Sequence, residues 1–308
     1  MEFSHRPVLL RETLESLAVR PEGKYIDGTA GGGGHSQAIA KKLTTGRLLA
    51  IDQDPDAVRA ASERLKSYPC AAVYRGNFAD LAAAAEKFGM VPADGVLFDL
   101  GVSSYQFDNP ARGFSYRADA PLDMRMSRTG VSARDLVNTL SERELARILF
   151  RYGEERHARS IARGIVRARE KAPVETTLQL AEIVKASVPA AARRGPGHPA
   201  RRTFQALRIQ VNAELDRLPA GLDAAFSVLK PGGRLAVITF QSLEDRIVKR
   251  RMAAWSSGLV PTPQDPRRAY RREPKARLLF RKGLTPSEEE IRENPRCRSA
   301  RLRVCIKL

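Results

Sequence analysis

The stretch Asp27-Gly-Thr-Ala-Gly-Gly-Gly-Gly-His35 follows a short apolar segment at residues 25–26 and precedes a helical pattern over residues 36–43. Glycines at such a turn let the backbone approach a ligand closely, and the N-terminus of the following helix favours an anionic group. A tight turn without any ligand would have the same composition. The stretch therefore predicts a strand–turn–helix unit, and a binding site there needs a second signal.

The residues that follow repeat this alternation of strand and helix. Apolar runs at 47–51, 71–74 and 96–98 predict strands, and residues 55–66 and 81–88 predict the helices between them. Asp54 is placed to cap the helix that begins at Pro55. Continuous apolar strands separated by helices are typical of a parallel sheet that is covered on both faces. The predicted fold class is therefore α/β, a doubly wound Rossmann-like sheet.

The rest of the chain predicts a helical insertion and a return to the sheet. Ser141 and Thr176 begin capping boxes, S-E-R-E and T-T-L-Q, ahead of amphipathic patterns. The basic Gly/Pro-rich segment 193–202 is expected to be a loop, as is the Pro- and Arg-rich segment 256–275. A strand is expected at 234–240, and the alternating segment 302–308 is expected to be a final edge strand. We expect a sheet domain of residues 1–109 and 211–308, and a helical insertion of residues 110–210.

The distribution of charge indicates the kind of partner. The chain has 53 Lys and Arg against 35 Asp and Glu, a net charge of +18. Residues 1–109 carry a net charge of −2, whereas residues 110–210 and 241–308 carry +10 each. Such segregation is typical of a protein that binds a phosphate backbone. A solvated basic surface and an anionic membrane are the weaker alternatives, and no basic amphipathic helix with a clean apolar face supports the membrane.

Several classes of protein are excluded by composition. No run of about 18 apolar residues predicts a membrane span, and the charged N-terminus has no signal-peptide core. The three cysteines, Cys70, Cys297 and Cys305, form no C-x-x-C pair, which excludes a disulfide scaffold and a cysteine-rich zinc site. This cysteine usage fits a reducing cytoplasm. No ligand cluster predicts a metal site.

Asp52 is the second signal for a cofactor. It ends the second predicted strand, 19 residues after Gly33, where a carboxylate can accept hydrogen bonds from ribose hydroxyls. A dinucleotide fingerprint would need a third glycine where Ser36 stands, and no P-loop or nucleophile elbow occurs. An adenosine-containing cofactor is predicted, and a nicotinamide-dependent oxidoreductase stays open as a rival.

The arrangement Asp27-x-Thr29-x-Gly31-x-Gly33 resembles the first motif of S-adenosylmethionine-dependent methyltransferases, although Thr29 stands where that motif often has glycine. Eight blocks in order resemble the bacterial MraW-type 16S ribosomal RNA methyltransferase family, and they span essentially the whole chain. The blocks are residues 27–36, DLGVSS at 99–104, RGFSY at 112–116, PLDMRM at 121–126, YGEER at 152–156, HPARRTFQALRI at 198–209, FQSLEDR at 240–246 and NPRCRS at 294–299.

The resemblance implies a class I methyltransferase fold, S-adenosyl-L-methionine as the cofactor, and N4 of a cytidine in the decoding centre as the methyl acceptor. The cofactor contacts that it implies are Gly33, Gly34, His35, Asp52, Phe78, Asp99 and Gln106. Alternatives stay open for three of them: Phe78 as plain core, His35 as a hydrogen bonder at the helix start, and Gln106 as a solvated loop residue.

Asp99 is also the candidate catalytic residue. A carboxylate near the cofactor could accept a hydrogen bond from N4–H and aim the nitrogen at the methyl carbon. Ser103 or Ser104 is expected nearby. The Asn/Asp-Pro-Pro-aromatic motif of DNA amino-methyltransferases is absent, because Asp99-Leu-Gly-Val stands in its place.

The partner implied is small-subunit ribosomal RNA or the small ribosomal subunit, with no membrane, and a homodimer is left open. The expected phosphate contacts are Arg193, Arg194, Arg201, Arg202, Lys249, Arg250 and Arg251. Two alternatives remain at this stage. The chain could be an RNA-binding assembly factor that has kept a cofactor fold, and the 193–202 loop could instead cover the cofactor as a lid.

Overall fold

A computed structural model describes residues 7–195, 197–261 and 269–308. The described chain divides into two compact units, one of residues up to 101 together with 215–308, the other of residues 102–214. The boundaries lie at 101/102 and 214/215, whereas the sequence analysis placed them at 109/110 and 210/211.

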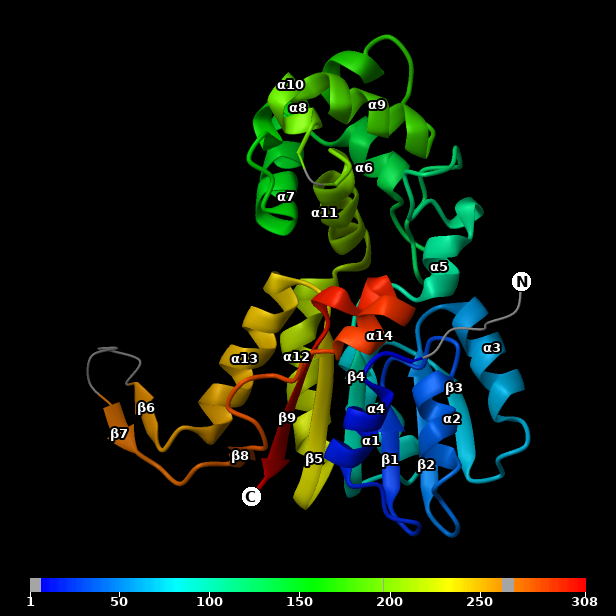
Figure 1. Cartoon of the computed structure of the whole chain (residues 1–308), viewed down its shortest axis with the longest axis vertical. Coiled ribbons are helices and arrows are strands. Elements are labelled where there is room, and N and C mark those ends of the chain that lie inside the picture. The colour runs from blue at the N-terminus through cyan, green and yellow to red at the C-terminus, as the bar shows by residue number, and fades with distance from the viewer. Residues whose placement is uncertain (1–6, 196, 262–268) are drawn as a thin grey trace. The chain divides into compact units, whose positions relative to one another are not determined.

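The first unit is built on a seven-stranded sheet with the order β3-β2-β1-β4-β5-β9-β8 (Figure 1). Its strands are β1 (Lys24–Asp27), β2 (Arg47–Asp52), β3 (Ala71–Arg75), β4 (Ala93–Asp99), β5 (Leu229–Thr239), β8 (Ala276–Leu278) and β9 (Arg301–Lys307). The first five pair in parallel, and β9 runs antiparallel to both β5 and β8. This order confirms the predicted doubly wound α/β fold.

Helices cover both faces of this sheet. They are α1 (Leu10–Leu17), α2 (Gly34–Ala40), α3 (Pro55–Leu65), α4 (Leu81–Lys87), α12 (Glu214–Val228), α13 (Ser242–Ser256) and α14 (Glu288–Glu293), with the 3-10 turns η1 (Phe78–Asp80) and η3 (Pro295–Ser299). Along β4, Val96 and Phe98 pack into one apolar cluster with α4, α12 and α13. Leu97, between them, packs into the other cluster with α1, α2 and α3. Both faces of the central strands are therefore buried, which is why their sequences are continuously apolar.

Two expectations for the C-terminal region are corrected. Segment 302–308 does form a strand, but β9 is not the edge, because the three-residue β8 pairs with its outer side. The segment 256–275 is not one long loop. Leu259–Pro261 (β6) pairs with Ala269–Arg271 (β7) as a two-stranded sheet, and residues 262–268 lie outside the described residues.

The second unit is helical. It contains α5 (Ser104–Asp108), the 3-10 turn η2 (Pro110–Arg112), α6 (Ala133–Thr139), α7 (Glu142–Gly153), α8 (Ala158–Arg169), α9 (Thr177–Ser187), α10 (Ala190–Arg193) and α11 (Arg201–Asn212). Ser141 and Thr176 make the predicted capping boxes of α7 and α9. The expected loop at 193–202 is shorter than predicted, because Arg193 ends α10 while Arg201 and Arg202 begin α11.

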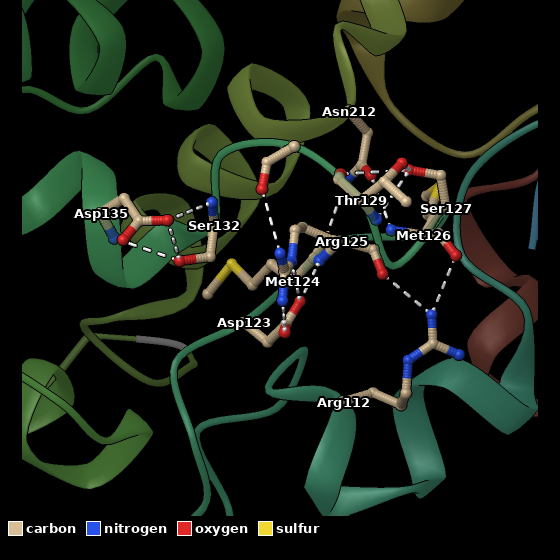
Figure 2. Close-up of polar contacts among 11 residues, drawn as sticks. Arg112, Asp123, Met124, Arg125, Met126, Ser127, Thr129, Ser132, Asp135 and Asn212 are labelled. Atoms are coloured by element: carbon tan, nitrogen blue, oxygen red, sulfur yellow. Dashed lines mark hydrogen bonds and ion pairs between the residues drawn. The ribbon is translucent and has the colours of Figure 1, made fainter.

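A buried polar network organises the segment between η2 and α6 (Figure 2). Arg112, only 2% exposed, donates from Nη2 to the carbonyl oxygens of Arg125 and Met126, at 2.9 and 3.1 Å. Asn212 of α11 accepts from the Met126 amide at 2.8 Å and donates to the Met124 carbonyl at 2.8 Å. Met124 is fully buried with φ of 62°, a left-handed conformation that costs free energy in a residue with a long side chain. The network holds this loop in a conformation that its own sequence does not favour.

Candidate functional site

Three carboxylates lie at the carboxyl ends of adjacent parallel strands. Asp27 ends β1, Asp52 ends β2 and Asp99 ends β4. β1 pairs with β2 on one side and with β4 on the other, so the strand order reverses at β1. Open α/β sheets bind ligands outside the carboxyl ends of the strands at this kind of reversal. The predicted cofactor edge is thus the point where the acidic side chains gather.

Asp27 uses its carboxylate for hydrogen bonds to other residues of the protein. It is 1% exposed, and it accepts a hydrogen bond from Ser36 Oγ at 2.6 Å and one from the Thr29 amide at 3.2 Å. Burial raises its pKa above the ordinary value, against the opposing effect of the Ser36 hydroxyl. Asp27 therefore ties the start of α2 to the end of β1 and fixes the glycine loop between them.

Asp52 fits the predicted ribose contact. Its Oδ2 accepts from the Gly31 amide at 2.8 Å and its Oδ1 accepts from the Asp54 amide at 2.8 Å. Each oxygen keeps a second lone pair, so the oriented carboxylate can accept two further hydrogen bonds. Burial raises the pKa of Asp52 to about 6, although the two amides work to lower it. A carboxylate held in this way suits the vicinal hydroxyls of a ribose.

His35 and Asp99 form a pair beneath the glycine loop. His35 is 5% exposed, and its Nε2 lies 3.0 Å from the Val8 carbonyl oxygen while its Nδ1 lies 3.5 Å from Asp99 Oδ2. A carbonyl and a carboxylate both accept, so the ring serves both only when both nitrogens carry protons. Burial works to lower the pKa of His35, but the hydrogen bond and charge of Asp99 leave it raised. Both ring nitrogens of His35 therefore face acceptor atoms of the protein, and Nδ1 is the one directed at Asp99.

Asp99 has one oxygen that the described residues leave without a hydrogen-bond partner. Its Oδ1 is buried and unpaired there, while Oδ2 faces His35. The Asp99 amide donates to Thr29 Oγ1 at 2.5 Å, so Thr29 links the β1 loop to the end of β4. A buried acceptor without a donor costs about 1–3 kcal/mol, which makes Oδ1 a position for a donor from a ligand.

The remaining expected cofactor residues divide between the units. Gly33 precedes α2 with φ of +77°, and a Cβ there would lie 3.1 Å from the Ala61 Cα. Phe78 packs its ring against Phe98, with centroids 5.4 Å apart, so it belongs at least partly to the core. Gln106 lies in the second unit, where it completes the capping box of α5 with Ser103. The contacts of Gly33, Gly34, Phe78 and Gln106 with a cofactor stay predictions.

Two acidic residues of the FQSLEDR segment after β5 bind other groups of the protein. Glu244 accepts from the amides of Phe240 and Gln241, at 3.0 and 3.3 Å, and so caps α13. Asp245 accepts two hydrogen bonds from Arg303 of β9, at 2.6 and 2.9 Å. Although burial works to raise it, the pKa of Asp245 stays below the ordinary value because of this guanidinium. No local sequence pattern indicates that Arg303, which is 8% exposed, is the partner of Asp245.

Three of the seven expected RNA contacts already have partners in the protein. Arg193 donates to the Val188 carbonyl at 3.1 Å, near the end of α9. Arg202 donates to the Glu154 carbonyl at 3.2 Å, at the end of α7, and Arg251 pairs with Asp223. The other four, Arg194, Arg201, Lys249 and Arg250, are exposed. All seven stay predictions as RNA contacts.

Neither a metal site nor a membrane span is found within the described ranges. No group of three or more His, Cys, Asp or Glu side chains there could hold a metal ion. Among those same residues, every helix is too short or too polar to cross a membrane.

Comparisons with known proteins identify relatives that match the whole chain. A family model described as the MraW methylase family matches residues 2–308. Ribosomal RNA small subunit methyltransferase H from Symbiobacterium thermophilum is 54% identical over 311 residues, covering 100% of this chain and 98% of the relative. The protein of the same name from Heliobacterium modesticaldum is 50% identical over 312 residues and covers 100% of both chains. A solved rRNA methylase from Streptococcus thermophilus covers 100% of this chain and 99% of its own, at 12% identity and a TM-score of 0.44.

Proposed function

The chain belongs to the MraW methylase family, and on that premise we propose that it methylates N4 of a cytidine in the decoding centre of 16S ribosomal RNA, with S-adenosyl-L-methionine as the methyl donor. The relatives named above are small-subunit ribosomal RNA methyltransferases. The choice of cytidine N4 rests on the resemblance and on the chemistry available at Asp99.

The observation that carries the proposal is the carboxylate oxygen Oδ1 of Asp99, which is available to accept a hydrogen bond. Oδ1 is buried without a donor among the described residues, at the strand end where the order of the sheet reverses. An exocyclic amine offers N–H donors, and a carboxylate oxygen is the matching acceptor. His35 holds the other oxygen, so the direction of Oδ1 is fixed before substrate arrives.

The chemistry requires help for a weak nucleophile. The lone pair of cytosine N4 is delocalised into the ring, and bound S-adenosylmethionine supplies a methyl group activated by its sulfonium. Asp99 Oδ1 accepts a hydrogen bond from N4–H, which draws electron density toward the nitrogen and orients it. As the new N–C bond forms, the bond between sulfur and the methyl carbon would break and S-adenosylhomocysteine would leave. N4 would lose one proton in this step, and Asp99 Oδ1 would accept it. Asp99 would then pass that proton to water, which returns the carboxylate to its starting form.

The cofactor would be held by the first unit. Asp52 would accept the ribose hydroxyls through its two oriented oxygens. The glycine loop and the start of α2 would approach the methionine moiety, and Phe78 would border the adenine. Gln106 is proposed as a further cofactor contact on the family resemblance alone.

The insertion is proposed as the RNA-substrate domain of a cytoplasmic enzyme. Residues 110–210 carry a net charge of +10, whereas residues 1–109, which contain the carboxylate cluster, carry −2. Phosphate binding and cofactor binding are therefore expected to be separable functions of different segments.

Mass spectrometry of small-subunit RNA from cells with and without the gene tests the proposal. We expect loss of N4-methylated cytidine without the gene, and restoration by the wild-type chain but not by Asp99→Ala. An unchanged level of N4-methylated cytidine would refute the proposed reaction. Thermal stabilisation by S-adenosylhomocysteine and not by NAD separates this reading from a nicotinamide-dependent oxidoreductase.

A further inference from the structure

The helix α7 exposes a row of arginines. Arg143, Arg147 and Arg151 are four residues apart, which places them on one face of a helix, and all three are exposed. The opposite face is buried and contains Leu145, Ile148, Leu149 and Tyr152. The arginines therefore occupy the solvent side of a helix whose other side is fixed in the core of the insertion.

The helix α8 repeats this pattern. Arg159, Arg163 and Arg167 are again four residues apart and exposed, while Ile161, Ala162 and Ile165 are buried. Two consecutive helices therefore present the same cation at the same spacing on their solvent-exposed sides.

The two rows border each other. α7 and α8 pack together within the second unit (Figure 1), and Arg163 of α8 lies 3.5 Å from Glu142 of α7. We call the six arginines of the two rows the arginine face. The acidic residues near it are already engaged in part. Glu144 binds its own capping Ser141, and Glu155 is buried with the His157 amide as a partner. Glu142 offsets one arginine, Arg163, so the face keeps an excess of positive charge.

One aromatic ring projects from this face. Phe150 is 69% exposed, the largest exposed fraction among the large apolar side chains described. In the sequence, Phe150 lies three residues after Arg147, which places both side chains on the same side of α7. The guanidinium of Arg151 lies 4.9 Å from the centroid of the Tyr152 ring. Proteins that bind single-stranded nucleic acids combine exposed aromatic rings, on which bases stack, with nearby cations that bind the phosphates.

We propose that the arginine face and Phe150 form a binding surface for single-stranded RNA, with the arginines on phosphates and Phe150 stacked on a base. This inference rests on the proposed function, because it takes the RNA of that reaction as the partner. It adds a surface on α7 and α8 to the seven basic residues expected from the sequence, none of which lies on these two helices.

RNA binding measured by fluorescence anisotropy over a series of salt concentrations tests the surface directly. The probe is an RNA that contains the decoding region of 16S ribosomal RNA. The triple variant Arg143→Gln, Arg147→Gln, Arg159→Gln should lower the slope of log affinity against log salt by about 2, since each lost contact with a single strand removes about 0.7. The matched control Lys41→Gln, Lys42→Gln, Lys66→Gln removes the same charge from exposed positions of the first unit and should leave the slope near the wild-type value.

Phe150 is tested by its own series. Phe150→Ala should weaken binding about 5- to 100-fold with an unchanged salt slope, because stacking releases no counterions. Phe150→Trp should bind as the wild type does, and Phe150→Leu should resemble the alanine variant. Calorimetry with S-adenosylmethionine should give the wild-type affinity for every variant. Urea denaturation should give the wild-type free energy of unfolding for each, which shows that the helical unit is folded.

Two results would overturn the proposal. One is a triple variant whose salt slope matches that of the lysine control. The other is a Phe150→Ala variant with normal RNA affinity and an altered mass by light scattering, which would make Phe150 a contact between copies of the chain. Methylation of small subunits by the wild-type chain is measured separately, so failure of the proposed reaction is distinct from failure of the surface.

Discussion

The two units contain buried polar networks of opposite kinds. In the first unit, Asp27, Asp52, Asp99 and His35 gather at the strand ends. Among the residues that the structure describes, none donates a hydrogen bond to Asp99 Oδ1. In the second unit, Arg112 and Asn212 bind main-chain atoms of the loop that contains Met124 and Met126 (Figure 2).

The difference separates a binding site from a scaffold. A network that presents unused acceptors has room for donors from a ligand, whereas one whose members are paired with the backbone fixes a conformation. Substitutions in the first network should therefore change cofactor binding or turnover. Substitutions in the second should change stability and leave the chemistry intact.

The largest effect is expected at Asp99. Asp99→Ala should lower turnover about 10²- to 10⁴-fold at saturating S-adenosylmethionine, the usual contribution of a positioned proton acceptor, with RNA affinity unchanged. Steady-state assays with small-subunit substrate measure this. Recovery of the full rate at high cofactor concentration would reduce Asp99 to a cofactor contact.

A large loss of stability is expected at Asn212. Asn212→Ala removes hydrogen bonds to Met124, Met126 and the Arg208 carbonyl and should lower the free energy of unfolding by about 2–4 kcal/mol, because buried partners are left unpaired. Urea denaturation measures it. The matched control is Asn138→Ala, which also loses contacts to Val174 and to the Arg134 carbonyl. Asn138 is only partly buried, so water can replace its bonds and the loss should be about 1 kcal/mol. Equal losses at both positions would contradict the special role of the buried network.

Asp52 is expected to affect only the cofactor. Asp52→Ala should weaken S-adenosylmethionine binding by about 1–3 kcal/mol, since hydrogen bonds to a charged group are worth that much. Isothermal titration calorimetry decides it. An unchanged affinity would remove the ribose assignment, and RNA binding should be normal in either case.

The pH dependence of cofactor binding follows from the same carboxyl. The pKa of Asp52 is raised to about 6, so a fall in pH from 7 to 5 should weaken cofactor binding by roughly tenfold, as the acceptor becomes protonated. The stability of the cofactor-free protein changes with pH in the opposite direction to cofactor binding. Because the folded pKa is raised, the contribution of Asp52 to stability is present below its unfolded value and is lost as pH rises through about 6. Calorimetry at several pH values should show the loss of affinity in the wild type and not in Asp52→Asn.

The smallest effect is expected at the start of α11. Arg201→Ala should lower the salt slope of RNA binding by about 0.7–0.9. Arg202→Ala should lower it less, because its guanidinium already donates to the Glu154 carbonyl. Cofactor affinity should stay normal for both. Weaker cofactor binding with a normal salt slope would support the lid interpretation of this segment instead.

The strands of the sheet could be predicted because their signals are local. Each of the first four is an apolar run that ends near a turn or an acidic residue, and the structure places β1, β2, β3 and β4 on those runs. β6, β7 and β8 could not be predicted in this way, because three residues are too few for a hydrophobic period. The position of β9 inside the sheet was missed for the same reason, since only β8 makes it an inner strand.

The positions of candidate site residues could be predicted where the residue directly follows a strand. Contacts between residues that are distant in the chain could not be predicted. Asp52 and Asp99 could be located from the ends of β2 and β4. The pairing of His35 with Asp99 and Val8, and of Arg303 with Asp245, depends on tertiary contacts that leave no local pattern. The arginine rows of α7 and α8, in contrast, do have a local pattern, because their spacing of four residues is visible in the sequence. A net charge summed over residues 110–210 does not reveal this spacing.

The insertion also has a consequence for the order in which the chain folds. β4 and β5 pair directly in the centre of the sheet, yet the whole of residues 102–214 separates them in the chain. During synthesis, β1 to β4 leave the ribosome with the edge of β4 open, and the strand that completes it comes only after the helical unit. Closing so long a loop has a high entropic cost when it is unstructured, and a folded insertion shortens the effective loop. The helical unit is therefore expected to fold before β5 pairs with β4. Early folding of this unit would shorten the time during which the open edge of β4 could pair with another chain.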